Sequence, residues 1–174
     1  MASTTLYLKY RPQTIDELDL KSARDSLAKI LSSKTIPHAF LFSGPRGTGK
    51  TSAARILAMS VNNLKDIDST DIIEMDAASN RGIDEIRTLR EQVALSPMNV
   101  KYKVYIIDEV HMLTVEAANA LLKTLEEPPA HAIFVLCTTD PQKLPETVIS
   151  RCTQVQFARP GLENTQPTAP IQAP

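Results

Sequence analysis

The stretch HAFLFSGPRGTGKTSAARILA, residues 38–58, decides the fold of this chain. It opens with the apolar run Ala39–Ser43, which predicts a buried strand. Residues 50–61 are rich in helix-forming side chains and carry apolar residues at helical spacing, so they predict a helix. Three glycines and a lysine lie at the junction of the two elements. A strand, a glycine-rich loop and a helix in this order indicate a loop that binds phosphate.

The loop matches the pattern G-x-x-x-x-G-K-[ST] with Gly44, Gly49, Lys50 and Thr51. Glycines bring backbone N–H groups close to phosphate oxygens, and the start of the following helix adds partial positive charge. We expect Lys50 to contact the β and γ phosphates of a nucleotide and the Thr51 hydroxyl to bind Mg²⁺. The alternative, a chance glycine-rich turn, does not explain the strand before it and the helix after it. The predicted nucleotide-binding residues of the loop are Gly44, Pro45, Arg46, Gly47, Thr48, Gly49, Lys50, Thr51 and Ser52.

Two adjacent acidic residues follow a second apolar strand, predicted at residues 103–108. We expect Asp108 to bind Mg²⁺ through its water shell and Glu109 to polarise a water for attack on the γ-phosphate. The pair therefore predicts hydrolysis rather than transfer of the phosphoryl group to another substrate. The alternative is a solvated acidic pair at a strand end. His111 fits a loop or packing histidine better than a residue that couples the site to a ligand.

Strands and helices alternate along the rest of the chain. Most of the predicted strands are continuous apolar runs, which is typical of a parallel sheet covered by helices on both faces. We therefore predict an α/β fold, a P-loop NTPase with a five-stranded parallel sheet sandwiched by helices. The remaining predicted elements are strands at 71–75, 132–139 and 153–157, the last at a sheet edge, and helices at 83–93 and 115–127, the second with Thr114 as its N-cap.

Composition limits the other possibilities. The chain has 174 residues and a formal net charge of -1, so a contact with nucleic acid would need a local basic patch. No apolar run approaches the ~20 residues that span a bilayer, and the N-terminus lacks a secretory signal, so we expect a cytoplasmic protein without membrane contact. Cys137 and Cys152 lack metal-ligand or redox spacing and predict free thiols.

The last segment differs from the rest in composition. Residues 159–174 contain four of the 12 prolines and almost no large apolar side chains. This composition predicts a disordered tail, and residues 1–158 are predicted to form one nucleotide-binding domain.

Two further polar residues stand near strand ends. If the strand that Thr139 ends lies between the strands leading to the loop and to Asp108, the Thr139 hydroxyl faces the γ-phosphate, where it can sense phosphate and orient the water. Ordinary capping of the strand is the alternative. Arg151 precedes the last strand, and an arginine beside a γ-phosphate stabilises charge during transfer, although a single surface arginine is usually only solvated.

Six segments together resemble a known family. They are KYRPQTIDEL, HAFLFSGPRGTGKTSAARILA, DAASNRGIDEIR, YIIDEVHMLT, ANALLKTLEEPP and VLCTTDPQKLPETVISRC. They resemble the gamma/tau subunits of bacterial DNA polymerase III over nearly all of residues 7–157. The resemblance implies an AAA+ fold and ATP as substrate. It also implies a pentameric ring, formed with delta and delta-prime subunits and copies of the chain itself, that opens the sliding clamp and places it on primed DNA.

The resemblance also implies roles for individual residues. Lys50 and Thr51 match the ligands of phosphate and Mg²⁺, and Asp108 and Glu109 match the metal-binding and water-activating acids. Thr139 matches the first sensor position. Arg151 matches an arginine finger that acts in trans on the ATP of a neighbouring subunit. Tyr10, Arg11 and Pro12 match a segment near the adenine, and Arg81 matches a position near the DNA backbone, where a solvated loop arginine is the alternative.

The chain departs from the family pattern in three ways. The four-cysteine zinc module before DAASN is absent, so we predict no zinc. The Gly-Gln after the YRP segment is replaced within ELDLKSARDSL, which puts the adenine contacts in doubt. The family's helical lid and collar domain are expected to be missing. The preferred hypothesis is a clamp-loader ATPase, and the alternative is a nucleotide-binding but catalytically incompetent structural or regulatory subunit. A Holliday-junction motor and a P-loop kinase fit the motifs less well.

Overall fold

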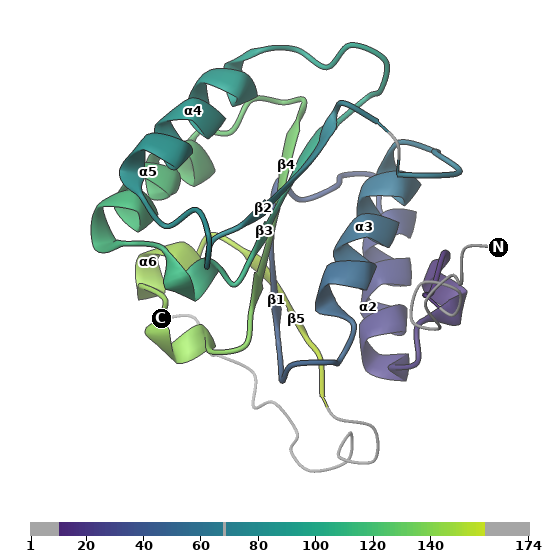
Figure 1. Ribbon diagram of the computed structural model, residues 1–174. Helices are drawn as coiled ribbons and strands as arrows, with labels where there is room; N and C mark the ends of the chain where they lie inside the picture. Colours follow the sequence, from purple (N-terminus) through teal and green to yellow (C-terminus); the bar gives the residue numbers. More distant parts are fainter. Residues whose placement is uncertain (1–10, 68, 159–174) are drawn as a thin grey trace, which may run out of the picture.

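Five parallel strands form one sheet in the computed structural model, which describes residues 11–67 and 69–158 (Figure 1). The order across the sheet is β2-β3-β4-β1-β5, and every neighbouring pair is parallel. The five-stranded parallel sheet expected from the sequence is confirmed. The strand β4, which leads to Thr139, lies between β1, which leads to the glycine-rich loop, and β3, which ends at Asp108. This is the strand order on which the expectation for Thr139 depended. The strands are β1 Ala39–Ser43, β2 Ile72–Asp76, β3 Lys103–Asp108, β4 Ala132–Thr138 and β5 Thr153–Gln156.

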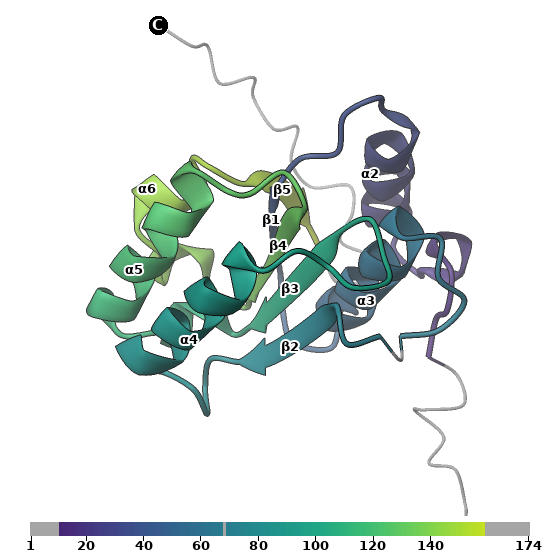
Figure 2. The ribbon, with the colours of Figure 1, turned by 90° about the horizontal axis from the view of Figure 1, so that it is seen from above.

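Helices cover both faces of this sheet. Helices α2 and α3 lie on one face, and α4, α5 and α6 lie on the other, as the two perpendicular views show (Figures 1 and 2). The Thr114 side chain accepts a hydrogen bond from the Ala117 N–H and caps α5, as predicted. The helices are α2 Lys21–Ser32, α3 Lys50–Val61, α4 Ile83–Ala94, α5 Val115–Glu126 and α6 Glu146–Ile149, with 3-10 turns η1 Ile15–Glu17, η2 Val110–Met112 and η3 Pro141–Lys143.

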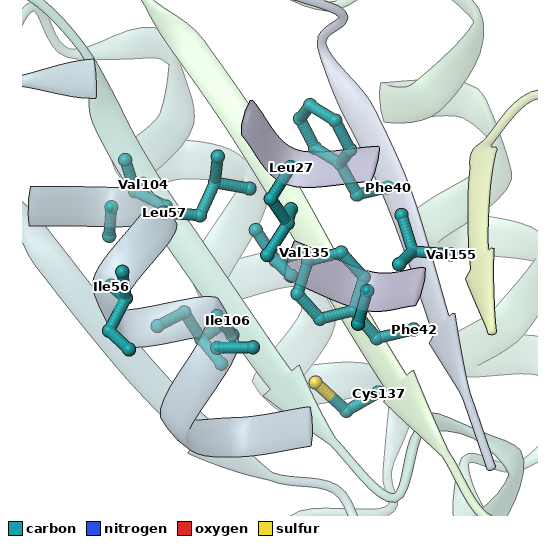
Figure 3. Close-up of a cluster of buried hydrophobic side chains, with 14 of the residues drawn as sticks. Leu27, Phe40, Phe42, Ile56, Leu57, Val104, Ile106, Val135, Cys137 and Val155 are labelled. Atoms are coloured by element: carbon teal, nitrogen blue, oxygen red, sulfur yellow. The ribbon is translucent and has the colours of Figure 1, made fainter. Parts of the chain in front are cut away.

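Alternating side chains of the central strands feed two separate cores. On β1, Phe40 and Phe42 pack toward α2 and α3, whereas Leu41 packs toward α4 and α5. Figure 3 shows the first core, in which Leu27 of α2 and Leu57 of α3 meet the strand side chains. Each fully buried side chain of this size contributes about 1.5–3 kcal/mol. The central strands are packed between helices on both faces, so the carboxyl ends of those strands are held in fixed positions relative to one another.

The outer strands are less buried than the central ones. In β5, Val155 is buried while Gln154 and Gln156 are exposed, so the predicted edge strand is confirmed. The strand β2 forms the opposite edge, and none of its five residues is fully buried.

Both cysteines are free thiols, as predicted. Burial raises the pKa of the Cys152 thiol to about 11, and it raises the pKa of Cys137 further, so both thiols stay protonated. No helix within the described ranges is long and apolar enough to cross a membrane. Tyr10 and the predicted tail at 159–174 lie outside the described residues.

Candidate nucleotide-binding site

The glycine-rich loop joins the carboxyl end of β1 to α3. Gly47 and Gly49 have φ angles of 79° and 86°, in the left-handed region that favours glycine. Gly49 is also the N-cap residue of α3, and no side chain caps that helix end. The N–H groups of the first helical turn therefore point toward the loop with only a ligand or water to satisfy them.

Gly44, the first glycine of the loop, packs against the chain just after β5. Its φ is 155°, and a Cβ built on it would lie 2.0 Å from the carbonyl oxygen of Phe157. The Phe157 N–H in turn donates to the Ser43 carbonyl. Contact with the backbone after β5 thus fixes the entrance of the loop, and only glycine leaves room for it.

Replacing Gly44 by alanine is expected to lower the free energy of unfolding by about 3 kcal/mol, through overpacking and an unfavourable φ. Gly47→Ala is the matched control, since its new Cβ would meet no described atom within 4 Å. Its left-handed backbone alone should cost about 1 kcal/mol. Urea unfolding of both variants tests this, and equal losses would show that the contact with Phe157 does not restrain the loop.

Lys50 reaches back under the loop. Its Nζ donates to the carbonyl oxygens of Gly44 and Pro45, at 2.8 and 2.9 Å, and only 6% of the residue is exposed. Burial lowers the pKa of the Lys50 amine, an effect that neighbouring groups including Glu109 and Asp108 oppose. The two hydrogen-bond partners are neutral carbonyls, so a ligand anion would supply the charge that this buried amine needs.

Thr51 and Asp108 meet at the carboxyl ends of β1 and β3. The Thr51 Oγ1 donates to Asp108 Oδ2 at 2.8 Å, and Asp108 Oδ1 accepts from the Glu109 N–H at 2.9 Å. Hydroxyl and carboxylate oxygens are ligands that suit Mg²⁺, which usually takes few protein ligands and completes its shell with phosphates and water. No cluster of three or more His, Cys, Asp or Glu side chains that could hold a metal occurs in residues 11–67 and 69–158.

Glu109 has an unusual backbone and a directed side chain. Its φ and ψ of 48° and 45° place a non-glycine residue in the left-handed region, a conformation that costs about 1–2 kcal/mol and is common at functional sites. Its Oε2 accepts from the Thr139 hydroxyl at 3.1 Å, and His111 Nδ1 lies 3.4 Å from the same oxygen. The carboxylate is therefore held against the end of β4.

His111 is the residue whose surroundings the sequence did not indicate. The sequence favoured a loop or packing histidine, and the structure places the ring in a turn where it packs against Thr138 and Glu109. No local pattern could reveal this, because Thr138 lies 27 residues away in the chain.

An open cavity of about 410 Å³ joins these groups. Its lining includes the loop backbone, Lys50, both acidic residues and two cationic side chains, Arg11 and Arg46. Arg11 Nε donates to the Ser52 hydroxyl at 3.1 Å, which ties the N-terminal segment to α3. The cavity thus offers basic groups and N–H donors on one side and two carboxylates on the other, a setting for a phosphorylated ligand with a metal ion.

A smaller, more apolar hollow adjoins the loop. Pro12, Leu18 and Leu20 line it together with Gly47, Thr48 and Gly49 of the loop. Leu18 and Leu20 are nearly buried, and they belong to the ELDLKSARDSL segment that replaces the family's Gly-Gln. These side chains make an apolar slot beside the phosphate loop, with the size and polarity that suit part of a planar base.

Arg151 and Arg81 lie away from this cavity. Arg151 Nη2 pairs with Glu126 Oε1 at 2.8 Å, and its Nη1 donates to the Thr147 carbonyl. It follows α6, a helix on the sheet face opposite α3 (Figure 1). Arg81 is exposed before α4, and its Nε donates to the Met112 carbonyl at 3.0 Å. The structure therefore does not bring Arg151 to the phosphate loop of its own chain.

The family model and the curated relatives that match this chain are subunits of DNA polymerase III. A protein-family model described as DNA polymerase III, delta subunit matches residues 66–161. DNA polymerase III subunit tau of Bacillus subtilis (strain 168) is 49% identical over 177 residues, covering 91% of this chain and 31% of the relative. The tau subunit of Escherichia coli (strain K12) is 46% identical, covering 88% and 27%. The chain thus spans about a third or less of the length of these curated relatives.

Solved structures support the same fold. A DNA polymerase III gamma subunit-related protein of Thermotoga maritima has a TM-score of 0.68 and 29% identity, over 80% of this chain and 47% of that one. The RuvB Holliday junction branch migration motor of the same organism has a TM-score of 0.64 and 22% identity, over 86% and 48%. At that identity, RuvB bears on the fold alone. Together these likenesses confirm the predicted AAA+ fold.

Proposed function

The chain belongs to the tau/gamma family of DNA polymerase III subunits, and we propose that it binds and hydrolyses ATP within a cytoplasmic clamp loader that places the sliding clamp on primed DNA. One observation carries the proposal. Lys50, Thr51, Asp108 and Glu109 converge on one cavity at the carboxyl ends of β1 and β3. The phosphate loop is intact, which favours a subunit that binds and hydrolyses ATP over one that only fills a place in the ring.

Nucleotide binding follows from the chemistry of the cavity. The loop N–H groups and the Lys50 amine bind the phosphates, and Arg11 and Arg46 add positive charge at the rim. Thr51 and Asp108 hold Mg²⁺, which neutralises phosphate charge when it is bound. The apolar slot at Leu18 and Leu20 receives the base in place of the family's usual contacts.

Hydrolysis depends on the orientation of one carboxylate. Glu109 accepts the proton of a water that attacks the γ-phosphate, and the Thr139 hydroxyl fixes the Glu109 side chain and senses the phosphate. The strained backbone of Glu109 supports this role, because such strain persists at sites where the surrounding contacts hold a residue in place.

The remaining roles involve other chains. Arg151 stabilises charge on the ATP of a neighbouring subunit, which accords with its position away from its own loop. Arg81 contacts a DNA phosphate from an exposed position before α4. The partners are delta and delta-prime subunits, further copies of the chain, the sliding clamp and primed DNA.

Two measurements test the proposal. Binding of a fluorescent ATP analogue to the chain should be saturable and should be lost in Lys50→Ala. Steady-state ATP hydrolysis by the chain mixed with delta and delta-prime subunits should rise when the clamp and primed DNA are added. Saturable binding with no turnover in the full mixture would instead identify a nucleotide-binding regulatory subunit. Failure of wild-type protein to bind the nucleotide would contradict the assignment of the loop.

A further inference from the structure

The His111 ring occupies a buried position between Glu109 and the end of β4. Its side chain is 8% exposed. Nδ1 lies 2.8 Å from Thr138 Oγ1 and 3.4 Å from Glu109 Oε2. The ring therefore bridges the proposed water-activating acid and a strand in the centre of the sheet.

A contact between His111 and Glu109 depends on which ring nitrogen carries the proton. An ionised carboxylate only accepts hydrogen bonds, so a contact between Nδ1 and Glu109 Oε2 requires a proton on Nδ1. Thr138 Oγ1 already accepts from the Asp140 N–H at 3.0 Å, and its second lone pair is open to the same Nδ1 proton. The proposed contact with Glu109 therefore requires the His111 proton on Nδ1, which lies 2.8 Å from Thr138 Oγ1 and 3.4 Å from Glu109 Oε2.

Thr138, which contacts the same ring nitrogen, is a rigid anchor. Thr138 is the last residue of β4 and is fully buried, and its carbonyl accepts from the N–H of Gly44, the first residue of the phosphate loop. The ring therefore holds Glu109 beside the same strand end to which the phosphate loop is hydrogen-bonded. A displacement of about 1 Å at such a site can cost about 100-fold in rate, so this coupling has kinetic consequences.

We propose that His111 is a positioning residue, which together with Thr139 fixes the Glu109 carboxylate for attack by water on the γ-phosphate. Both contacts are made to Oε2, so Oε1 is the oxygen presented to the water. The left-handed backbone conformation of Glu109 is unfavourable in itself, so contacts with neighbouring side chains must hold the residue in it. This inference rests on the proposed function, in which Glu109 activates the water.

Kinetics of three variants in the full mixture with partner subunits, clamp and primed DNA test the proposal. His111→Ala is expected to lower kcat about 10-fold with nucleotide affinity changed less than about twofold. His111→Asn, whose amide nitrogen can take the place of Nδ1, should recover to within about threefold of wild type. His111→Phe keeps the bulk without the donor and should remain as slow as His111→Ala. An unchanged or faster kcat in His111→Ala would overturn the proposal.

A double variant separates positioning from general damage to the fold. In a Glu109→Gln background, His111→Ala should cause no further loss of kcat, because the carboxylate that it orients is gone. Losses that multiply would mean that His111 acts independently of Glu109, against the proposal. His131→Asn is the matched control, since its ring bonds to the Val93 carbonyl at the opposite end of the sheet, and its kcat should equal that of wild type.

Nuclear magnetic resonance of the imidazole nitrogens gives a readout that does not need turnover. The wild-type His111 Nδ1 should show a bonded proton, and its signal should move in Glu109→Gln. His38 provides an internal reference, because its Nδ1 contacts the Ala132 carbonyl and must donate. An Nδ1 without a proton would overturn the inference even if ATP is hydrolysed. If wild-type protein shows the Nδ1 proton but does not hydrolyse ATP, the proposed function is contradicted, whereas the contact between His111 and Glu109 is still supported.

Discussion

Replacement of Glu109 by glutamine is expected to slow ATP hydrolysis about 1,000-fold while nucleotide affinity changes less than about twofold. Glutamine keeps the size of the side chain and an oxygen that can accept from Thr139, so the local structure should persist. What it loses is the ability to accept a proton from water. Because the phosphate ligands proposed above are the loop and Lys50 rather than Glu109, binding should be retained.

The measurement is single-turnover hydrolysis in the assembled mixture, alongside titration with a fluorescent ATP analogue. Glu91→Gln is the control, since it removes an exposed acid on α4 and should leave both quantities at wild-type values. Hydrolysis by Glu109→Gln at the wild-type rate would remove Glu109 from the mechanism. A parallel loss of binding and turnover would indicate that Glu109 supports the loop instead of the chemistry.

The sheet and the phosphate loop could be predicted because their signals are local. Each central strand is buried on both faces and is therefore a continuous apolar run, and Ala39–Ser43 and Lys103–Asp108 coincide with the predicted strands. The helix Lys50–Val61 likewise has the predicted limits. In these elements the hydrophobic pattern and the tertiary environment agree, so the sequence alone is sufficient.

Elements with a weak local signal were missed or displaced. The helix α2 was not predicted, because no side chain caps its start at Leu20 and its fully buried stripe consists of only Ala23 and Leu27. The strand β2 was predicted one residue too early. Asp71 is not part of it, and its buried carboxylate accepts from the N–H groups of Met98 and Asn99, 27 and 28 residues away. Such a long-range contact leaves no trace in a local pattern.

The same reasoning applies to the candidate site. The two acids and the loop could be predicted from their spacing to a strand end, because parallel strands bring their carboxyl ends to one edge of the sheet. The contact of His111 with Thr138 depends instead on the sheet order, which sets β4 beside β3. The sequence shows which strands exist, whereas the neighbours of each strand are decided by tertiary packing.

Arg151→Ala is expected to lower turnover about 1,000-fold in the assembled mixture, within the range by which arginine fingers accelerate phosphoryl transfer. Nucleotide affinity of the isolated chain should not change, because Arg151 pairs with Glu126 and does not line its own cavity. The ion pair does not prevent action in trans. Both partners are partly exposed, so the pair is worth at most about 1 kcal/mol, and a triphosphate on a neighbouring chain can replace Glu126.

Glu126→Gln is the matched control for that argument. It removes the charge that pairs with the guanidinium and keeps Arg151 itself, so turnover should stay within about fivefold of wild type. A loss as large as that of Arg151→Ala would mean that the Arg151–Glu126 pair serves the structure of α5 and α6 and that no finger acts from this position.

Mixing two inactive variants distinguishes action in trans from action in cis. Glu109→Gln supplies an intact Arg151, and Arg151→Ala supplies an intact Glu109. If the finger serves the neighbouring site, some interfaces in the mixture combine both groups, and turnover should rise well above that of either variant alone. If Arg151 served its own chain, every site would lack one group and the mixture would stay as slow as its components. Recovery on mixing would therefore show that each active site is formed by two adjacent chains. Each chain has a complete phosphate loop, but neither chain alone is sufficient for rapid hydrolysis.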